Sequence, residues 1–173
     1  MKVAVTGATG FVGQYAVKAL LANGAEVVAV SRSPGNIFQP DDKLEIVTLD
    51  IGNTDNPQDQ MGNPDVLLHL DWEGLPRYHS EHHLNQELPK QIAFLEACAR
   101  GGLKRLIVTG TCLEYGMQSG CLDETLTTTP TTAYGKAKDM LRTYLQSSPK
   151  LMEMELTWLR LFYLYGPGQA ATS

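Results

Sequence analysis

Little in this sequence points to a membrane, an oxidising compartment or a nucleic acid. Its three cysteines, Cys98, Cys112 and Cys121, lack paired or metal-ligand spacing, which is typical of a reducing cytoplasm. Lysines and arginines number 14 against 19 aspartates and glutamates, so the basic face that a phosphate backbone requires is missing. No apolar run approaches membrane-spanning length, and Lys2 directly precedes an expected strand. We therefore expect a cytoplasmic protein with neither nucleic-acid nor membrane partners.

The chain is also poor in histidine. His79, His82 and His83 cluster, but no carboxylate or cysteine stands at a clear ligand spacing, so we expect a solvated surface and no metal site. The composition is otherwise that of an ordinary globule, 43% hydrophobic and 19% charged, over 173 residues. That length has room for one domain with a sizeable core.

The most informative stretch begins with a short apolar run that breaks off at Gly7 and resumes as a helical pattern from Phe11. A buried parallel strand that turns sharply into a helix produces this pattern. In the spacing G-x-x-G-x-x-G, Gly7 allows the tight turn, Gly10 lets a pyrophosphate approach, and Gly13 lets the helix pack on the strand. Backbone N–H groups at the helix start then face the phosphates. We interpret this as a dinucleotide-binding turn; the alternative is an ordinary strand–turn–helix with three small residues.

Apolar runs and amphipathic segments alternate along the rest of the chain. They predict strands at residues 2–6, 26–30, 44–49, 65–70, 103–109 and 155–162, and helices at 11–23, 89–100 and 133–147. Residues 53–63 are expected to form a short helix or loop with little core, and a polar excursion is expected to continue to about residue 87. This alternation predicts an α/β fold, a Rossmann-type doubly wound parallel sheet in three α/β/α layers.

The end of the second strand bears on the choice of cofactor. In a dinucleotide fold this tip lies roughly 20 residues after the glycine turn and meets the adenosine ribose. A carboxylate there would bond both ribose hydroxyls, but this chain has Ser31 and Arg32. Because Arg32 can pair with a 2′-phosphate and stack on adenine, we predict NADP(H), with NAD(H) as the alternative. A solvent-exposed arginine at a loop start would explain Arg32 without any cofactor.

Tyr134 and Lys138 form Y-x-x-x-K at the start of an expected helix, so their side chains share one face. A tyrosine with its usual pKa of about 10 is a poor base at neutral pH. An ammonium one helical turn away favours the phenolate, which predicts a lowered pKa for Tyr134. Thr111 follows the fifth strand, where its hydroxyl can bond a substrate carbonyl or alcohol. Taken singly, each observation has a simpler explanation. Tyr and Lys occur at this spacing in helices by chance, and Thr111 alone is explained as a polar residue at a strand end.

Together with the glycine turn, these residues resemble an extended short-chain dehydrogenase/reductase of the NAD-dependent epimerase/dehydratase type. The matching stretches occur in the family's order: residues 6–13, Asp50, His69-Leu70, 111–116, 134–138 and 160–167. The resemblance implies that Thr111, Tyr134 and Lys138 are catalytic and that the substrate is a nucleotide sugar. The implied cofactor contacts are Gly7, Thr9, Gly10, Phe11, Val12, Gly13, Ser31, Arg32, Asp50, Ile51, Leu70, Asp71, Thr109, Tyr134, Lys138, Phe162 and Leu164.

The sequence departs from the family's pattern at several positions. The usual His-Leu-Ala-Ala after the fourth strand ends here in Asp71-Trp72, which makes that cofactor-facing loop bulkier and more acidic. Glu87 stands where the family has a helix asparagine, with Asn85 two residues away. Tyr163 replaces the asparagine that follows the arginine of strand six, so the usual substrate-phosphate contacts are not expected.

A further departure bears on the reaction. The 4,6-dehydratases of this family follow the catalytic threonine with Asp-Glu, whereas this chain has Cys112-Leu113, which argues against eliminating water. Residues 110–117 and 162–166 more resemble the nucleotide-sugar 4-ketoreductase branch. We predict reduction of a 4-keto-6-deoxy sugar at C4 with Tyr134 as acid/base. The alternatives are a 4-epimerase and a non-catalytic NAD(P)-binding module or fragment, and a homodimer stays open.

The position of the last residues carries one more expectation. Extended members of the family carry a C-terminal portion that closes over the sugar nucleotide, and this chain stops just after residues 166–168. We therefore expect residues 1–173 to form the NAD(P)-binding Rossmann domain without the substrate-binding portion. A cleft lacking one wall positions its substrate and excludes water poorly, so slow turnover is expected.

Overall fold

In the computed structural model, which describes residues 1–151 and 153–169, six strands form one parallel sheet in the order β3-β2-β1-β4-β5-β6. The strands are β1 (Lys2–Thr6), β2 (Glu26–Ser31), β3 (Leu44–Thr48), β4 (Val66–His69), β5 (Arg105–Thr111) and β6 (Glu155–Leu161). The helices are α1 (Phe11–Ala22), α2 (Pro57–Gln60), α3 (Leu88–Arg100) and α4 (Ala133–Ser147). The order of the strands reverses between β1 and β4, where doubly wound folds bind their ligands.

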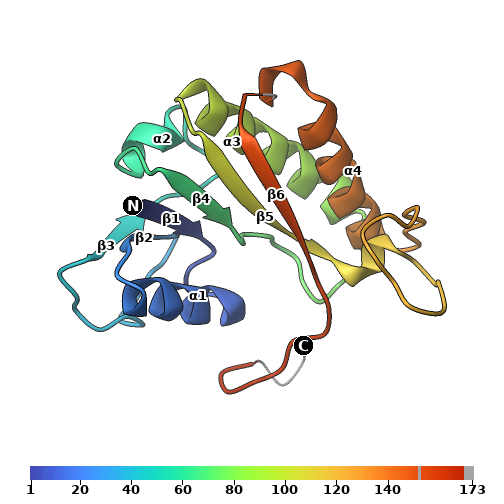
Figure 1. The fold of residues 1–173 in the computed structure, drawn as a ribbon, viewed down its shortest axis with the longest axis horizontal. Helices are drawn as coiled ribbons and strands as arrows, with labels where there is room; N and C mark the ends of the chain where they lie inside the picture. The colour runs from blue at the N-terminus through green and yellow to red at the C-terminus, as the bar shows by residue number, and fades with distance from the viewer. Residues whose placement is uncertain (152, 170–173) are drawn as a thin grey trace.

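The helices cover both faces of the sheet, with α1 on one side and α3 and α4 on the other (Figure 1). Alternate side chains of each strand supply the two cores. Val3 and Val5 of β1 pack with Val17 of α1, whereas Ala4 between them belongs to the cluster that contains Phe94 and Leu141. The predicted three-layer Rossmann-type fold is confirmed.

Residues 83–87 differ from the sequence prediction, which was wrong to extend a polar excursion to residue 87. They form a π-helical segment, η1 (His83–Glu87), that runs directly into α3. Both His83 and Glu87 are fully buried, because polar partners inside the fold satisfy them. The expectation of a solvated histidine surface is therefore wrong for His83.

Residues 53–63 were expected to contribute little core, and here too the structure differs. The short helix α2 places Pro57 and Gln58 inside, and Met61 just after it is fully buried in the larger core cluster. The Gln58 amide nitrogen donates to the carbonyl oxygen of Pro64 at 3.1 Å, whereas its buried Oε1 has no hydrogen-bond partner within the described residues. The polar composition of residues 53–63 predicts little core, but the fully buried Met61 contributes to the core although most of its neighbours in the sequence are polar.

The strand β5 begins and ends two residues later than predicted, at Arg105 and Thr111 rather than at residues 103 and 109. Its last residue pairs with Leu161 of the edge strand β6. This register makes Thr111 the final residue of the strand, at the carboxyl edge of the sheet.

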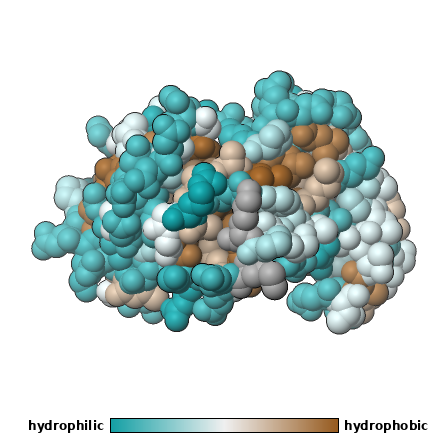
Figure 2. Space-filling view, turned by 90° about the horizontal axis from the view of Figure 1, so that it is seen from above, coloured by the Kyte–Doolittle hydropathy of each residue, from teal (hydrophilic) through white to brown (hydrophobic). Residues whose placement is uncertain are grey.

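None of the helices in the described ranges combines the length and hydrophobicity needed to cross a membrane. Hydrophilic residues cover most of the face shown in Figure 2, and hydrophobic residues form separate patches.

The close contact between α1 and the turn that follows β1 makes Gly13 sensitive to substitution. A Cβ at this position would lie 2.2 Å from the carbonyl oxygen of Gly7 and 2.7 Å from that of Ala8. We expect Gly13→Ala to reduce the free energy of unfolding by about 1–3 kcal/mol, because the backbone of the turn and that of α1 would have to separate. Urea titration followed by circular dichroism measures this, with Gly166→Ala, whose Cβ would meet only ordinary contacts, as the control. Equal midpoints for the two variants would contradict the prediction.

Candidate active site

A cavity of about 630 Å³ opens at the carboxyl edge of the sheet, between the start of α1, the end of β5 and the start of α4. Many of the residues that the sequence predicts for catalysis or cofactor contact line it: Phe11, Val12, Leu70, Thr109, Thr111, Tyr134, Lys138, Phe162 and Leu164. Segments separated by more than a hundred residues in the chain therefore meet at one site.

Thr111 is held by the turn that follows β5. Its hydroxyl oxygen accepts a hydrogen bond from the N–H of Leu113 at 3.3 Å, and its own N–H donates to Glu114 Oε1 at 2.8 Å. This reciprocal pair is a capping box for the 3₁₀ turn η2 (Cys112–Glu114). The hydroxyl is used there as an acceptor, so its proton is not part of this bond.

Glu114, which the sequence analysis did not single out, is fully buried beneath this turn. Besides the N–H of Thr111, it accepts hydrogen bonds from Trp158 Nε1 at 3.1 Å and from Arg160 Nε at 2.8 Å. A buried carboxylate is tolerated only with such partners. The pKa of the Arg160 guanidinium is raised: burial alone would lower it, and its bond to Glu114 outweighs that effect. Trp158 and Arg160 of β6 thus hold in place the turn that follows β5.

Tyr134 lies in an aromatic enclosure at the start of α4. Its ring centroid is 5.3 Å from that of His83 and 5.7 Å from those of Trp72 and Tyr78. Burial, assisted by the negative charge of Glu114, raises the pKa of Tyr134 above its ordinary value. This direction is opposite to the lowering that Y-x-x-x-K predicts, because Lys138 Nζ lies 6.0 Å from the centre of the ring and the phenol is shielded from water.

Lys138 is almost completely buried, and its ammonium donates to the carbonyl oxygen of Thr109 at 2.9 Å. The same nitrogen lies 4.0 Å from the centre of the Trp72 ring, a cation–π contact. Burial lowers the pKa of Lys138 to about 7, against the raising influence of Glu114, Glu87 and Asp71. The lysine is therefore close to the point at which it gains or loses its proton at neutral pH.

The glycine turn has the conformation that a dinucleotide requires. Gly7 adopts a φ of +66°, and a Cβ there would lie 3.0 Å from the backbone of Leu70 and Asp71. Gly10 is the N-cap of α1 and no side chain caps the helix, so the first N–H groups are open to a phosphate. These features fit a pyrophosphate lying across the start of α1. Within the same turn, Thr9 Oγ1 lies 3.1 Å from Ser31 Oγ, which ties it to the end of β2.

Ser31 and Arg32, predicted to meet the adenosine ribose, line a neighbouring recess rather than the main cavity. Three other predicted cofactor contacts, Gly7, Ile51 and Asp71, also line this recess. Burial raises the pKa of Asp71. Asp50 lies farther out, beside Arg32 in an adjacent cavity, where it accepts a hydrogen bond from the N–H of Gly52 at 3.0 Å.

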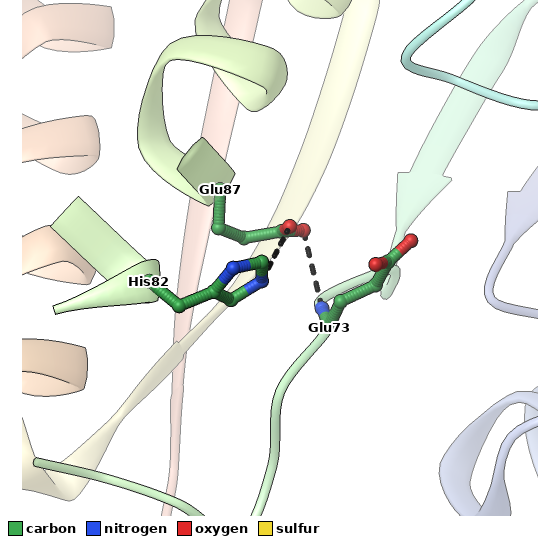
Figure 3. Close-up of side chains that lie close together, drawn as sticks. All are labelled: Glu73, His82 and Glu87. Carbon is green, nitrogen blue, oxygen red and sulfur yellow. Dashed lines mark hydrogen bonds and ion pairs between the residues drawn. The ribbon is translucent and has the colours of Figure 1, made fainter. Parts of the chain in front are cut away.

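Glu73, His82 and Glu87 lie close together next to this recess, with one ligand atom of each within 4.8 Å of the others (Figure 3). Three such ligands resemble a metal site, but Lys90 already supplies the positive charge: its Nζ lies 2.7 Å from Glu87 Oε2 and 3.0 Å from Glu73 Oε1. Burial works against ionisation of Glu87, and hydrogen bonds from Lys90, Gln91 and the Glu73 N–H outweigh it to lower its pKa. We interpret the cluster as an ion-pair network.

Sequence reasoning missed several residues that shape the site. His83 accepts the Trp72 indole N–H at 3.1 Å and lies beside Tyr134, but nothing in its local sequence signals burial. Tyr78 accepts the N–H of Tyr134 on its carbonyl oxygen at 2.9 Å. Trp72 gave a signal as a bulky departure in the loop after β4, yet its contact with Lys138 needs the folded structure.

This arrangement of sheet, glycine turn, strand-end threonine and helix-borne Tyr-Lys pair defines a nucleotide-cofactor enzyme fold. Residues 3–173 match the NAD dependent epimerase/dehydratase family, and the chain belongs to that family.

Several known proteins are similar to this chain over nearly its whole length. A dTDP-6-deoxy-L-talose 4-dehydrogenase (NAD(+)) of Aggregatibacter actinomycetemcomitans is 32% identical, over 96% of this chain and 62% of that protein. A probable UDP-arabinose 4-epimerase of Arabidopsis thaliana is 26% identical, over 95% and 44%. The structure of UDP-glucuronic acid 4-epimerase from Bacillus cereus with UDP-glucuronic acid and NAD superposes with a TM-score of 0.83 at 26% identity, over 98% and 59%. The chain thus spans between 44% and 62% of these relatives.

Proposed function

We propose that the chain forms the cofactor-binding part of an NAD(P)-dependent oxidoreductase that reduces a 4-keto-6-deoxy nucleotide-diphosphate sugar at C4. The observation that carries this proposal is that Thr111, Tyr134 and Lys138 line the same cavity as the first residues of α1. The names of the relatives, a sugar 4-dehydrogenase and 4-epimerases, support chemistry at C4 of a nucleotide sugar.

Each of the three side chains has a role that its position supports. A bound nicotinamide supplies the hydride that C4 receives. Tyr134 donates its phenolic proton to the 4-oxygen, Thr111 orients that oxygen through its hydroxyl, and Lys138 holds ribose hydroxyls from beneath. The carbonyl carbon gains the hydride and the oxygen gains the proton, so the keto group becomes an alcohol. The start of α1 binds the pyrophosphate through its N–H groups.

A protonated Tyr134 is compatible with reduction as the first step. A raised pKa keeps the phenol protonated at neutral pH, which is the state that a proton donor needs. An epimerase begins by oxidising a hydroxyl and needs a base at the same position. Lys138, whose pKa is about 7, exchanges protons readily at neutral pH and lies one helical turn from Tyr134.

Two other activities remain as competitors. A 4-epimerase would use the same Thr111, Tyr134 and Lys138 and is favoured by the names of several relatives. A non-catalytic dinucleotide-binding module has no need of a buried proton donor in the cavity, so these three residues argue against it. Elimination of water is not proposed, since Cys112 and Leu113 follow Thr111 where dehydratases carry an acid and a base.

A direct assay separates these functions. The protein is mixed with reduced dinucleotide and a 4-keto-6-deoxy nucleotide sugar, and nicotinamide absorbance is followed together with the configuration at C4. Loss of absorbance with one alcohol formed per dinucleotide oxidised supports the reductase. Inversion at C4 of a hydroxyl sugar at constant absorbance identifies an epimerase. Dinucleotide binding without any sugar chemistry, in a length-complete version of the protein, identifies the module.

Arg32 is the cation that the 2′-phosphate of NADP(H) would bind. A charge-assisted bond to a phosphate contributes roughly 1.5–3 kcal/mol, equivalent to about tenfold to a hundredfold in affinity. We expect Arg32→Ala to weaken NADPH binding by about tenfold or more and NADH binding much less, measured by fluorescence titration of both dinucleotides. Equal losses for the two would show that Arg32 only packs against adenine.

A further inference from the structure

Arg32 already has an anionic partner in the structure. Its Nη1 lies 2.6 Å from Oε1 of Glu73, which belongs to the loop after β4. This ion pair joins the tip of β2 to the neighbouring loop at the edge of the recess that Ser31, Ile51 and Asp71 also line. A 2′-phosphate that paired with Arg32 through Nη1 would have to take the place of the Glu73 carboxylate.

Glu73 is fixed in this position by two further contacts. The same Oε1 atom lies 3.0 Å from Lys90 Nζ on α3, so one carboxylate oxygen bridges two cations. The backbone N–H of Glu73 donates to Oε1 of the buried Glu87 at 3.1 Å (Figure 3). Because Glu87 is itself held by Gln91 at 2.7 Å, the loop has little freedom to carry Glu73 away from Arg32.

The charge of the surroundings points the same way. The cavity of about 270 Å³ between β2, the loop after β4 and α3 is lined by two cations, Arg32 and Lys90. It is also lined by three carboxylates, those of Asp50, Glu73 and Glu87, which outnumber these two cationic side chains. A phosphate dianion entering this cavity would be repelled unless one carboxylate were removed or displaced. Without Glu73, the two cations would face the same space unbridged.

We propose that Glu73 determines the choice between NADH and NADPH, by competing with the 2′-phosphate for Arg32 and Lys90. This inference rests on the proposed function, since it concerns the cofactor of that site. The carboxylate that discriminates against a 2′-phosphate is supplied by the loop after β4, and not by the tip of β2. The prediction of NADP(H) from Ser31 and Arg32 therefore does not take the competing Glu73 carboxylate into account.

The test is a titration of NADPH and NADH, followed by nicotinamide fluorescence, into the wild-type protein and four variants. These are Glu73→Gln, Arg32→Ala, the double variant, and Glu155→Gln as a matched control. Glu155 pairs with Arg105 at 3.1 Å at the amino ends of β5 and β6, away from the recess. The readout is the ratio of the two dissociation constants, so a general loss of folded protein cancels.

We expect Glu73→Gln to shift the ratio toward NADPH by about fivefold or more, equivalent to about 1 kcal/mol, with NADH affinity nearly unchanged. The shift should be largely lost when Arg32→Ala is also present, and Glu155→Gln should leave the ratio at its wild-type value. An unchanged ratio in Glu73→Gln, or an equal shift without Arg32, overturns the inference while the dinucleotide site stands. A wild-type protein that binds neither dinucleotide overturns the proposed function itself.

Discussion

Replacing Tyr134 with phenylalanine in a length-complete version of the protein is expected to reduce turnover of the keto sugar by about 10²–10⁴-fold, the usual contribution of a general acid. The change removes only the phenolic oxygen, and the ring keeps its contacts with Trp72 and His83. Dinucleotide affinity should therefore stay close to that of the wild type. The rate is followed as loss of nicotinamide absorbance and the affinity by titration of the same preparation.

The matched control for this prediction is Tyr144→Phe on the same helix. The Tyr144 hydroxyl donates to Glu96 outside the cavity, so its loss should leave turnover nearly unchanged. If Tyr134→Phe retained most of the wild-type rate, Tyr134 would not be the proton donor. If it also abolished dinucleotide binding, the loss of rate would reflect a damaged site instead.

Lys138 should make the stability of the protein depend on pH in an unusual direction. Burial lowers its pKa from 10.5 to about 7, so between these pH values the unfolded chain binds more protons at this group than the folded protein does. The free energy of unfolding must then rise with pH across that window. The contribution reaches up to about 4 kcal/mol by pH 10 and is absent below about pH 7, where Lys138 is protonated in both states.

Lys138→Met retains an unbranched side chain and removes the titrating group, so the variant should lose this rise. Urea titrations at several values between pH 7 and pH 10 measure the difference between the two proteins, in which other titrating groups largely cancel. Lys136→Met, at an exposed position on the same helix, should follow the wild type throughout. A Lys138→Met curve parallel to that of the wild type would show that the lysine is not desolvated in solution.

The sequence predicts the parts of the site that depend on local patterns. The turn at Gly7 can be predicted from the sequence, because a left-handed backbone after a buried strand favours glycine. In the structure Gly7 has a φ of +66°. The helix bearing Tyr134 and Lys138 begins and ends as predicted, at Ala133 and Ser147. Helical periodicity places those two side chains on one face without any knowledge of the rest of the chain.

The pKa of Tyr134 shows where such reasoning stops. The Y-x-x-x-K spacing places a lysine nearby, but whether that lysine is charged and whether the phenol is hydrated depend on Trp72, Tyr78 and His83. All three come from the segment after β4, more than fifty residues earlier in the chain. Desolvation by distant residues therefore reverses a direction that local spacing alone predicts.

By itself the sequence determined the alternation of strands and helices, the glycine turn, the position of Thr111 at the carboxyl edge of the sheet, and the shared helix face of Tyr134 and Lys138. These follow from hydrophobic periodicity and backbone preference, which act between near neighbours. Only the tertiary structure decided which charges meet: Glu114 with Arg160 across 46 residues, and Glu73 with Arg32 and Lys90. Ion pairs between distant elements leave no periodic trace in a sequence, because their partners are chosen by the packing of segments that lie far apart along the chain.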